Sequence, residues 1–267
     1  MRNLKFYKHC FAILLIISIM SCKKDRHLSR IEGLRLEIND SLGHNKAIDS
    51  FISPYRDHVN KNLDSVISYS ADLYSKGDGE LNTAIGNMMA DIVFEQAEPI
   101  YKSRTGNSID MVLLNHGGIR SILPKGPITT RTAYEIMPFE NSIVVVEMKM
   151  EVIDSMLRYL VAAKRAHPVS GLKLWLSDHD KIVKAEINGR HIDSVKTYSV
   201  ATNDYLYYGG DRMNFFKMGD SMHVMNYKIR NAMIDYFHKY DTISPKRDDR
   251  FIRTNDSILL TKADSGQ

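Results

Sequence analysis

The sequence has little cysteine, no long apolar run and little excess charge, and each shortage excludes a class of protein. Only two of the 267 residues are cysteines. Cys10 would be lost with the N-terminal signal described below, so the mature chain has no internal disulfide and depends on its hydrophobic core. Arg2, Lys5 and Lys8 supply most of the formal charge of +4, and the remaining chain carries +1. That balance gives no polybasic argument for binding nucleic acid or a membrane surface.

The remaining composition is that of a globular protein. Hydrophobic residues make up 43% of the chain and charged residues 25%, as in ordinary folded domains. The length allows one large domain or two small ones. There is no internal repeat and no low-complexity tract, so a solenoid or a disordered chain is excluded.

Residues 1–21 have the three parts of an export signal. A basic stretch precedes the apolar run from Phe11 to Ile19, and Ser21-Cys22 follows before a charged segment. The run is too short, and too soon followed by charge, for a membrane-spanning helix. The segment resembles a bacterial lipoprotein signal, which implies cleavage before Cys22 and a lipid on its thiol. The protein would then be anchored in the cell envelope, in the periplasm or at the outer-membrane face. The alternative is an ordinary secretory peptide cleaved nearby.

The patterns predict an α+β domain at residues 46–243 between two polar segments. Residues 22–45 are predicted to be a tether that ends in an edge strand near 34–38, where apolar and charged residues alternate. Residues 244–267 are charged and poorly patterned, and are predicted to be a C-terminal tail. Within the domain, the hydrophobic spacing predicts helices at 47–64, 83–100, 151–166 and 227–240, and strands at 66–73, 111–114, 143–148, 171–177, 181–187 and 198–202.

The most informative stretch follows the apolar strand from Met111 to Leu114. It ends in the sequence NHGGIR, where Gly117 and Gly118 would allow positive φ angles and the close approach of a ligand. Asn115 and Arg120 supply an amide and a fixed guanidinium group. Together they suit a polar, anionic small molecule. The alternative is a tight turn with a surface arginine.

Two further turns carry side chains suited to a flat ligand. Phe139 lies in the turn PFENS, where an aromatic residue is either part of the core or a stacking platform. The sequence NDYLYYGGD brings Tyr205 and Asp211, a ring for stacking and a carboxylate that accepts hydrogen bonds from vicinal hydroxyls. The alternative for this segment is a tyrosine-rich surface turn. Asp178-His179-Asp180 is interpreted as a turn between strands, because no other metal ligands fall at a supporting spacing.

Four motifs in this order resemble the C-terminal domain of 5′-nucleotidases, a family of enzymes that dephosphorylate nucleotides. They are ELNTAIGNMMAD (residues 80–91), NHGGIR with GPIT after it (115–129), PFEN (138–141) and YSVATNDYLYYGGD (198–211). Four ordered motifs over about half the chain are more specific than any one alone. The resemblance implies a mixed, layered α/β/β/α fold and a place in nucleotide catabolism.

The resemblance also implies a role for each binding residue. In the family, two aromatic rings hold the base between them, and these correspond to Phe139 and Tyr205. Asn115 would approach the base, Arg120 would reach the ribose and phosphates, and Asp211 would accept the ribose hydroxyls. Stacking would contribute about 1–3 kcal/mol per ring. The predicted substrate-binding residues are Asn115, Gly117, Gly118, Arg120, Phe139, Tyr205 and Asp211.

Three positions depart from the family pattern. Residues 77–80 (GDGE) stand where the family carries a further arginine, so one cation is missing. His116 replaces the first glycine of NGGGIR, and is either a neutral variation or a titratable group beside the ligand. Tyr205 stands where phenylalanine is common, a change that keeps the stacking surface.

The largest departure concerns catalysis. The family places a metallophosphatase domain with two metal ions before this one, and residues 23–75 are too short for it. A D-x-H sequence occurs only at residues 25–27, directly after the signal, and the motif G-N-H-[DE] is absent. Without two metal ions, phosphate-ester hydrolysis loses its main catalytic machinery. We therefore expect no catalytic residue, metal or cofactor in this chain, and a separately encoded metallophosphatase as its partner. The alternatives are a stand-alone envelope lipoprotein that binds nucleosides or nucleotides without catalysis, and a degenerate interaction scaffold.

Overall fold

The computed structural model describes residues 28–39 and 41–254, together with Tyr7, His9, Phe11 and Ile13. Cys22 and most of the predicted signal lie outside the described residues. The chain divides into two units, Met1–Phe51 and Ile52–Gln267, and all four motifs lie in the second. None of the described helices combines the length and the hydrophobicity that a membrane span requires.

The polar segment before the domain forms no strand within its described residues. Residues 28–39 are exposed and belong to neither a helix nor a strand, so the edge strand predicted at 34–38 is wrong. An alternating pattern makes a strand only where a neighbouring strand offers hydrogen bonds, and none pairs with it. The helix predicted at 47–64 is confirmed as α2 (Lys46–Leu63), and none of its residues is buried.

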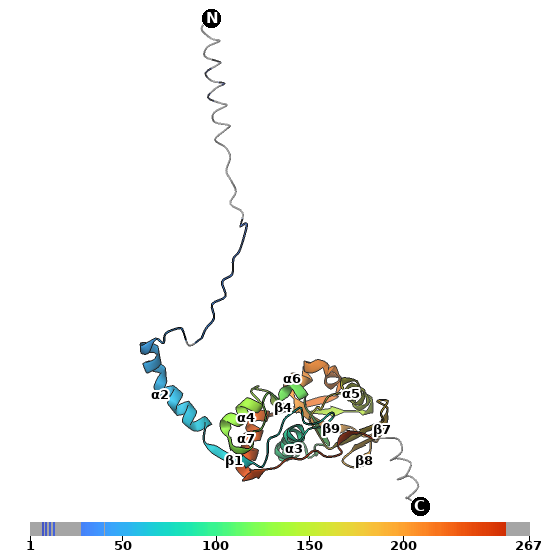
Figure 1. Ribbon diagram of the computed structural model, residues 1–267. Coiled ribbons are helices and arrows are strands. Elements are labelled where there is room, and N and C mark those ends of the chain that lie inside the picture. The colour runs from blue at the N-terminus through green and yellow to red at the C-terminus, as the bar shows by residue number, and fades with distance from the viewer. Residues whose placement is uncertain are drawn as a thin grey trace, which may run out of the picture. The chain divides into compact units, whose positions relative to one another are not determined.

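A five-stranded sheet forms the centre of the second unit (Figure 1), with the strand order β10-β4-β9-β2-β5. The strands are β2 (Met111–Leu113), β4 (Ser142–Met148), β5 (Val169–Ser170), β9 (Tyr198–Asn203) and β10 (Ser221–Lys228). The strands predicted at 111–114, 143–148 and 198–202 are therefore confirmed. β9 runs parallel to β2 and antiparallel to β4.

Both faces of this sheet are buried, which explains its nearly continuous apolar strands. Val112 and Leu114 pack into one hydrophobic core, and Met111 and Leu113 pack into the other. Three helices build the first core with the sheet: α3 (Ala84–Thr105), α4 (Thr130–Ile136) and α7 (Ile229–Lys239). The second core contains α5 (Met150–Ala163) and a second sheet. The layered α+β fold is thus confirmed.

The second sheet has four strands in the order β12-β6-β7-β8. These strands are β6 (Leu172–Leu176), β7 (Ile182–Ile187), β8 (Arg190–His191) and β12 (Phe251–Arg253). Asn188 and Gly189, with φ angles of 51° and 69°, form the predicted hairpin turn. Asp178-His179-Asp180 lies in the turn between β6 and β7, as predicted. A three-stranded sheet joins β1 (Val66–Ser70), β3 (Gly126–Thr129) and β11 (Thr242–Ile243).

The domain does not end at residue 243, and the prediction of a tail from 244 is wrong for residues 244–254. Strand β12 pairs in parallel with β6, and Phe251 is completely buried in the second core. The pattern is misleading because charged residues normally indicate a solvent-exposed segment. Here Arg250 instead forms ion pairs with Asp91 and Asp248. Residues 255–267 lie outside the described residues.

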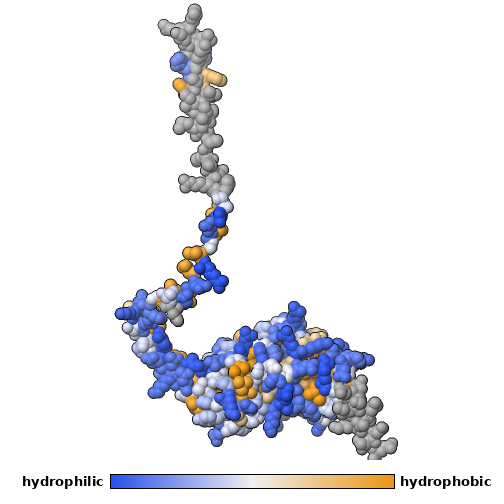
Figure 2. Space-filling model, viewed as in Figure 1, coloured by the Kyte–Doolittle hydropathy of each residue, from blue (hydrophilic) through white to orange (hydrophobic). Residues whose placement is uncertain are grey.

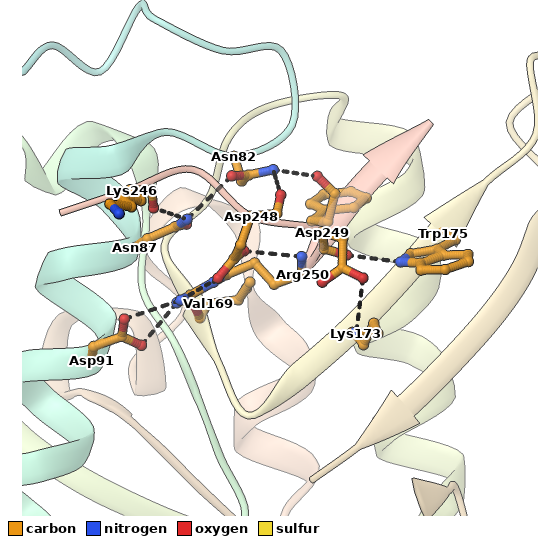
Figure 3. A network of polar contacts seen from close by, with 11 residues as sticks. Asn82, Asn87, Asp91, Val169, Lys173, Trp175, Lys246, Asp248, Asp249 and Arg250 are labelled. Carbon is orange, nitrogen blue, oxygen red and sulfur yellow. Dashed lines mark hydrogen bonds and ion pairs between the residues drawn. The ribbon is translucent and has the colours of Figure 1, made fainter. Parts of the chain in front are cut away.

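Figure 3 shows how the C-terminal segment is fixed at the start of α3. Asn87 donates to the carbonyl oxygen of Lys246 (3.1 Å) and to the side chain of Asn82 (3.2 Å). Asp91 accepts two hydrogen bonds from Arg250, at 2.8 and 3.0 Å. Asn87 and Asp91 of the first motif therefore stabilise the fold here by holding the C-terminal segment.

The surface of the second unit is mainly hydrophilic on the face shown in Figure 2. Its hydrophobic residues form small, separate patches there, and charged side chains surround them. Scattered apolar residues of this kind are normal on a protein surface.

Candidate functional site

Three turns that carry predicted binding residues meet at one edge of the central sheet. NHGGIR follows β2 and NDYLYYGGD follows β9, and the carboxyl ends of these two parallel strands lie at the same edge. PFENS precedes β4, which is antiparallel to β9, and Ile143 is paired with Asn203. The strand directions alone therefore bring together residues almost a hundred positions apart.

A cavity of about 230 Å³ lies between these turns and is lined by Asn115, Gly117, Arg120, Phe139, Asn141, Tyr205 and Asp211. Six of the seven predicted binding residues are in this lining, and Gly118 is buried beside Asn115. Asn141 is an addition that the sequence analysis missed, although it belongs to the PFEN motif. The structure brings the predicted residues together, and their roles toward a nucleotide stay predictions.

Asp211 is held at one end of the cavity by several hydrogen bonds. Its carboxylate accepts from the amide of Asn115 (2.6 Å) and from the hydroxyl of Tyr205 (3.2 Å). Its carbonyl oxygen accepts from the hydroxyl of Tyr159 (2.9 Å). Asp211 and Arg212 both have left-handed backbones, with φ angles of 50° and 63°. A carboxylate has about four acceptor positions, so Asp211 can still accept hydrogen bonds from a ligand.

Two aromatic rings are exposed in the cavity wall. As whole residues, Phe139 and Tyr205 are 40% and 46% exposed, so Phe139 is not a core residue. The guanidinium carbon of Arg120 lies 5.9 Å from the centroid of the Phe139 ring. An exposed aromatic ring on a loop beside a fixed cation suits stacking on a flat, anionic ligand.

Arg230, on α7, fixes the PFENS turn from behind. Its guanidinium donates to the carbonyl oxygens of Pro138 (3.2 Å) and Phe139 (3.3 Å). It also forms an ion pair with Glu140, as does Lys228. The hydrogen bonds from Lys228 and Arg230 lower the pKa of Glu140 to about 2. Sequence reasoning missed Arg230 because it lies ninety residues after the turn in an amphipathic helix.

Gly117 and Gly118 provide space rather than an unusual backbone. They belong to the 3₁₀ helix η1 (His116–Gly118), and neither has a positive φ angle, so that part of the prediction is wrong. A Cβ atom on Gly118 would lie 3.0 Å from Oδ1 of Asn115, and one on Gly117 would lie 3.3 Å from Nδ2 of the same side chain. The glycines therefore make room for the amide that holds Asp211.

His116 does not line this cavity. Its Nδ1 atom lies 3.2 Å from the carbonyl oxygen of Ala166, and its backbone N–H donates to Nδ1 of His167 (3.2 Å). Burial lowers the pKa of His116 and lowers the pKa of His167 to about 4. His167 is therefore neutral at pH 7, and it supports the backbone of the NHGGIR turn.

Lys76 is a cation that directly precedes residues 77–80, the segment in which this chain lacks the arginine of the family pattern. Its ammonium group donates to the carbonyl oxygen of Ile119 (2.8 Å), the residue before Arg120. Its charge also contributes to lowering the pKa of His116, after the larger effect of burial. The sequence indicates only weakly that Lys76 lies near the NHGGIR turn, because its one clue is that Lys76 directly precedes the segment 77–80.

Within residues 28–39 and 41–254, no group of three or more His, Cys, Asp or Glu side chains is arranged to hold a metal ion. The residues that line the cavity offer aromatic rings, hydrogen-bonding groups and charges. These groups suit the binding of a flat, polar ligand.

Comparison with known protein families gives a match to the model described as 5′-nucleotidase, C-terminal domain, over residues 60–218. This range contains all the residues of the cavity. It covers more than half of the chain.

The individual relatives described here share less than 30% of their residues with this chain over the matched parts. The chain is 28% identical to the cell wall protein Lmo0130 of Listeria monocytogenes, over 71% of this chain and 23% of that protein. It is 26% identical to protein UshA of Escherichia coli, over 66% of this chain and 32% of that protein. Among solved structures, a 5′-nucleotidase precursor from Thermus thermophilus matches with a TM-score of 0.65 and 23% identity, over 78% of this chain and 43% of that one. The chain therefore spans less than half the length of these proteins.

Proposed function

The chain belongs to the 5′-nucleotidase C-terminal domain family, and from this premise we propose that it recognises nucleosides or nucleotides at the cavity between its three turns. The observation that carries the proposal is the pair of exposed rings, Phe139 and Tyr205, in the wall of one cavity with Asp211 and Arg120. Two rings offer stacking surfaces for a base, the carboxylate accepts ribose hydroxyls, and the guanidinium binds phosphate.

We further propose that hydrolysis requires a metallophosphatase that is encoded separately. The curated relatives and solved structures that match are more than twice as long as their matched parts. In a nucleotide hydrolase of this kind, a pair of metal ions would activate water and stabilise the leaving oxygen. This chain would supply the recognition of the substrate.

We propose that both proteins act in the cell envelope, with this chain held by a lipid on Cys22. The signal-like residues 1–21 support this location, and one matching relative is named as a cell wall protein. Mass spectrometry of the membrane fraction tests the anchor: a Cys22→Ser variant would lose the lipid and leave the membrane.

Calorimetric titration of the purified protein with adenosine, AMP and UDP-glucose tests the proposed recognition, with phosphate release assayed on the same samples. Phe139→Ala should weaken binding by about 5- to 150-fold, the equivalent of one stacking contact. Asp211→Ala should weaken it through lost hydrogen bonds to the ribose. Tyr208→Ala is the matched control, because this exposed tyrosine lies in the same segment and does not line the cavity.

Saturable binding that both variants weaken, without phosphate release, would support a recognition module and direct the search to a metallophosphatase partner. If the protein binds the ligands and no metallophosphatase partner is found in envelope extracts, the stand-alone binding protein is favoured. If none of the three ligands binds the wild-type protein, the nucleotide site is refuted for the isolated chain.

A further inference from the structure

A second, larger cavity lies next to the first. It has a volume of about 470 Å³. Gly117 and Asp211 line both cavities, so the two cavities share a wall. The shared wall contains the carboxylate that we assign to the ribose hydroxyls, which places the second cavity on the ribose side of the proposed nucleoside site.

The second cavity is lined by two arginines. Arg165 follows the end of α5, and Arg212 follows Asp211. Both side chains are exposed, and neither has an ion-pair partner among the residues that the structure describes. Among the described residues of the lining, Asp211 alone carries a carboxylate, and this group is already bound by Asn115 and Tyr205. The cavity therefore has a net positive charge.

Two half-buried or buried polar groups complete the wall. The hydroxyl of Tyr159 donates to the carbonyl oxygen of Asp211 and so fixes the boundary between the cavities. His167 is 4% exposed. Its Nδ1 atom accepts a hydrogen bond from His116, so the proton of the neutral ring is on Nε2. That atom is buried and has no hydrogen-bond partner in the described part of the chain, so His167 forms part of the wall and adds no charge to it.

We propose that this second cavity binds a phosphate group on the 2′ or 3′ oxygen of the ribose, so that the preferred ligands are nucleoside 2′- or 3′-phosphates. This inference rests on the proposed function, because it requires a nucleoside whose ribose faces Asp211. A phosphate on one hydroxyl leaves the other free to donate to Asp211. Two guanidinium groups outweigh one carboxylate that is already hydrogen-bonded, and arginine binds phosphate with two parallel hydrogen bonds.

The test is calorimetric titration of the full chain in mild detergent with adenosine, 2′-AMP, 3′-AMP, 5′-AMP and inorganic phosphate. Arg165→Gln and Arg212→Gln each remove one cation from the cavity. Arg190→Gln is the matched control, because it removes the same charge from the exposed strand β8. We expect 2′-AMP or 3′-AMP to bind about tenfold more tightly than adenosine, an advantage that each cavity variant reduces to about threefold or less. Adenosine affinity should stay within about twofold in all three variants.

The outcomes separate this inference from the proposed function. If adenosine binds in a manner that depends on Phe139, and the 2′- and 3′-phosphates bind no more tightly, the inference is refuted and the proposed function stands. An advantage that survives in both cavity variants also refutes it. If inorganic phosphate binds to the arginines and the ribose-linked phosphates gain nothing, the cavity is a site for free anions and the inference fails. Absence of any adenosine binding refutes both.

Discussion

The buried histidine His167 should make the stability of the domain depend on pH. Its ring lies behind the NHGGIR turn, 5.6 Å from the ring of Tyr159, and it is 4% exposed. Burial, aided by the charge of His116, lowers its pKa from 6.5 to about 4. The folded protein therefore binds fewer protons than the unfolded chain between these two values, and the stability that His167 contributes at neutral pH is lost as the pH falls through this range.

The size of the effect follows from the two pKa values. Between about pH 7.5 and pH 5, protonation of the unfolded chain at this one position should lower the free energy of unfolding by about 2 kcal/mol. In His167→Gln this contribution disappears, while a glutamine oxygen can still accept the N–H of His116. The variant should therefore lose about 2 kcal/mol less than the wild type over the same interval.

Urea denaturation followed by circular dichroism at the two pH values measures this difference. The comparison uses the change with pH and not the absolute stability, because the substitution also alters packing. His191→Gln, at an exposed position on β8, is the matched control and should behave as the wild type does. If the wild type and His167→Gln lose the same stability within about 0.5 kcal/mol, the reasoning from burial is wrong.

Three further predictions concern the supports of the site. Arg230→Met should release the PFENS turn and weaken nucleoside binding by about tenfold, at a cost of about 1–3 kcal/mol in stability; unchanged affinity in calorimetry would contradict the assigned support. Arg250→Ala should destabilise the domain by about 1–3 kcal/mol, since its carboxylate partners are half exposed. The emission of Trp175, the single tryptophan, should shift to the red as its hydrogen bond to the C-terminal segment is lost, and an unchanged spectrum would argue against release. Gly118→Ala should displace Asn115 and lower nucleoside affinity by about threefold, with less than about 1 kcal/mol lost in stability; equal affinity would show that the wall adapts.

The local elements of the fold could be predicted because their signals are local. The continuous apolar run of β2 indicates a strand that is buried on both faces. The apolar residues of α3 recur at helical spacing, which indicates a helix with a buried face. Thr83, an expected N-cap, accepts from the backbone N–H of Gly86. The turn Asn188-Gly189 has the positive φ angles that its residue types favour.

The errors arose where a segment is stabilised by distant residues. Residues 244–254 look like a charged tail, but Arg250 is neutralised by Asp91, which lies 159 positions earlier. The alternation at 34–38 looks like a strand, but no strand among residues 28–39 and 41–254 pairs with it. A charge pattern or an alternation is compatible with several environments, and only the neighbouring elements select one.

For the site, the sequence by itself determined which residues are candidates and in which turns they lie. Glycines beside Asn115, an aromatic in PFENS and a carboxylate after two glycines are local chemical facts. Only the tertiary structure decided that these turns share one cavity, because the parallel pairing of β2 with β9 and the antiparallel pairing of β4 with β9 set the common edge. It also decided that Arg230 supports the PFENS turn and that a second, positively charged cavity lies behind Asp211. Strand pairing and side-chain packing join residues far apart in the chain, and no local pattern contains that information.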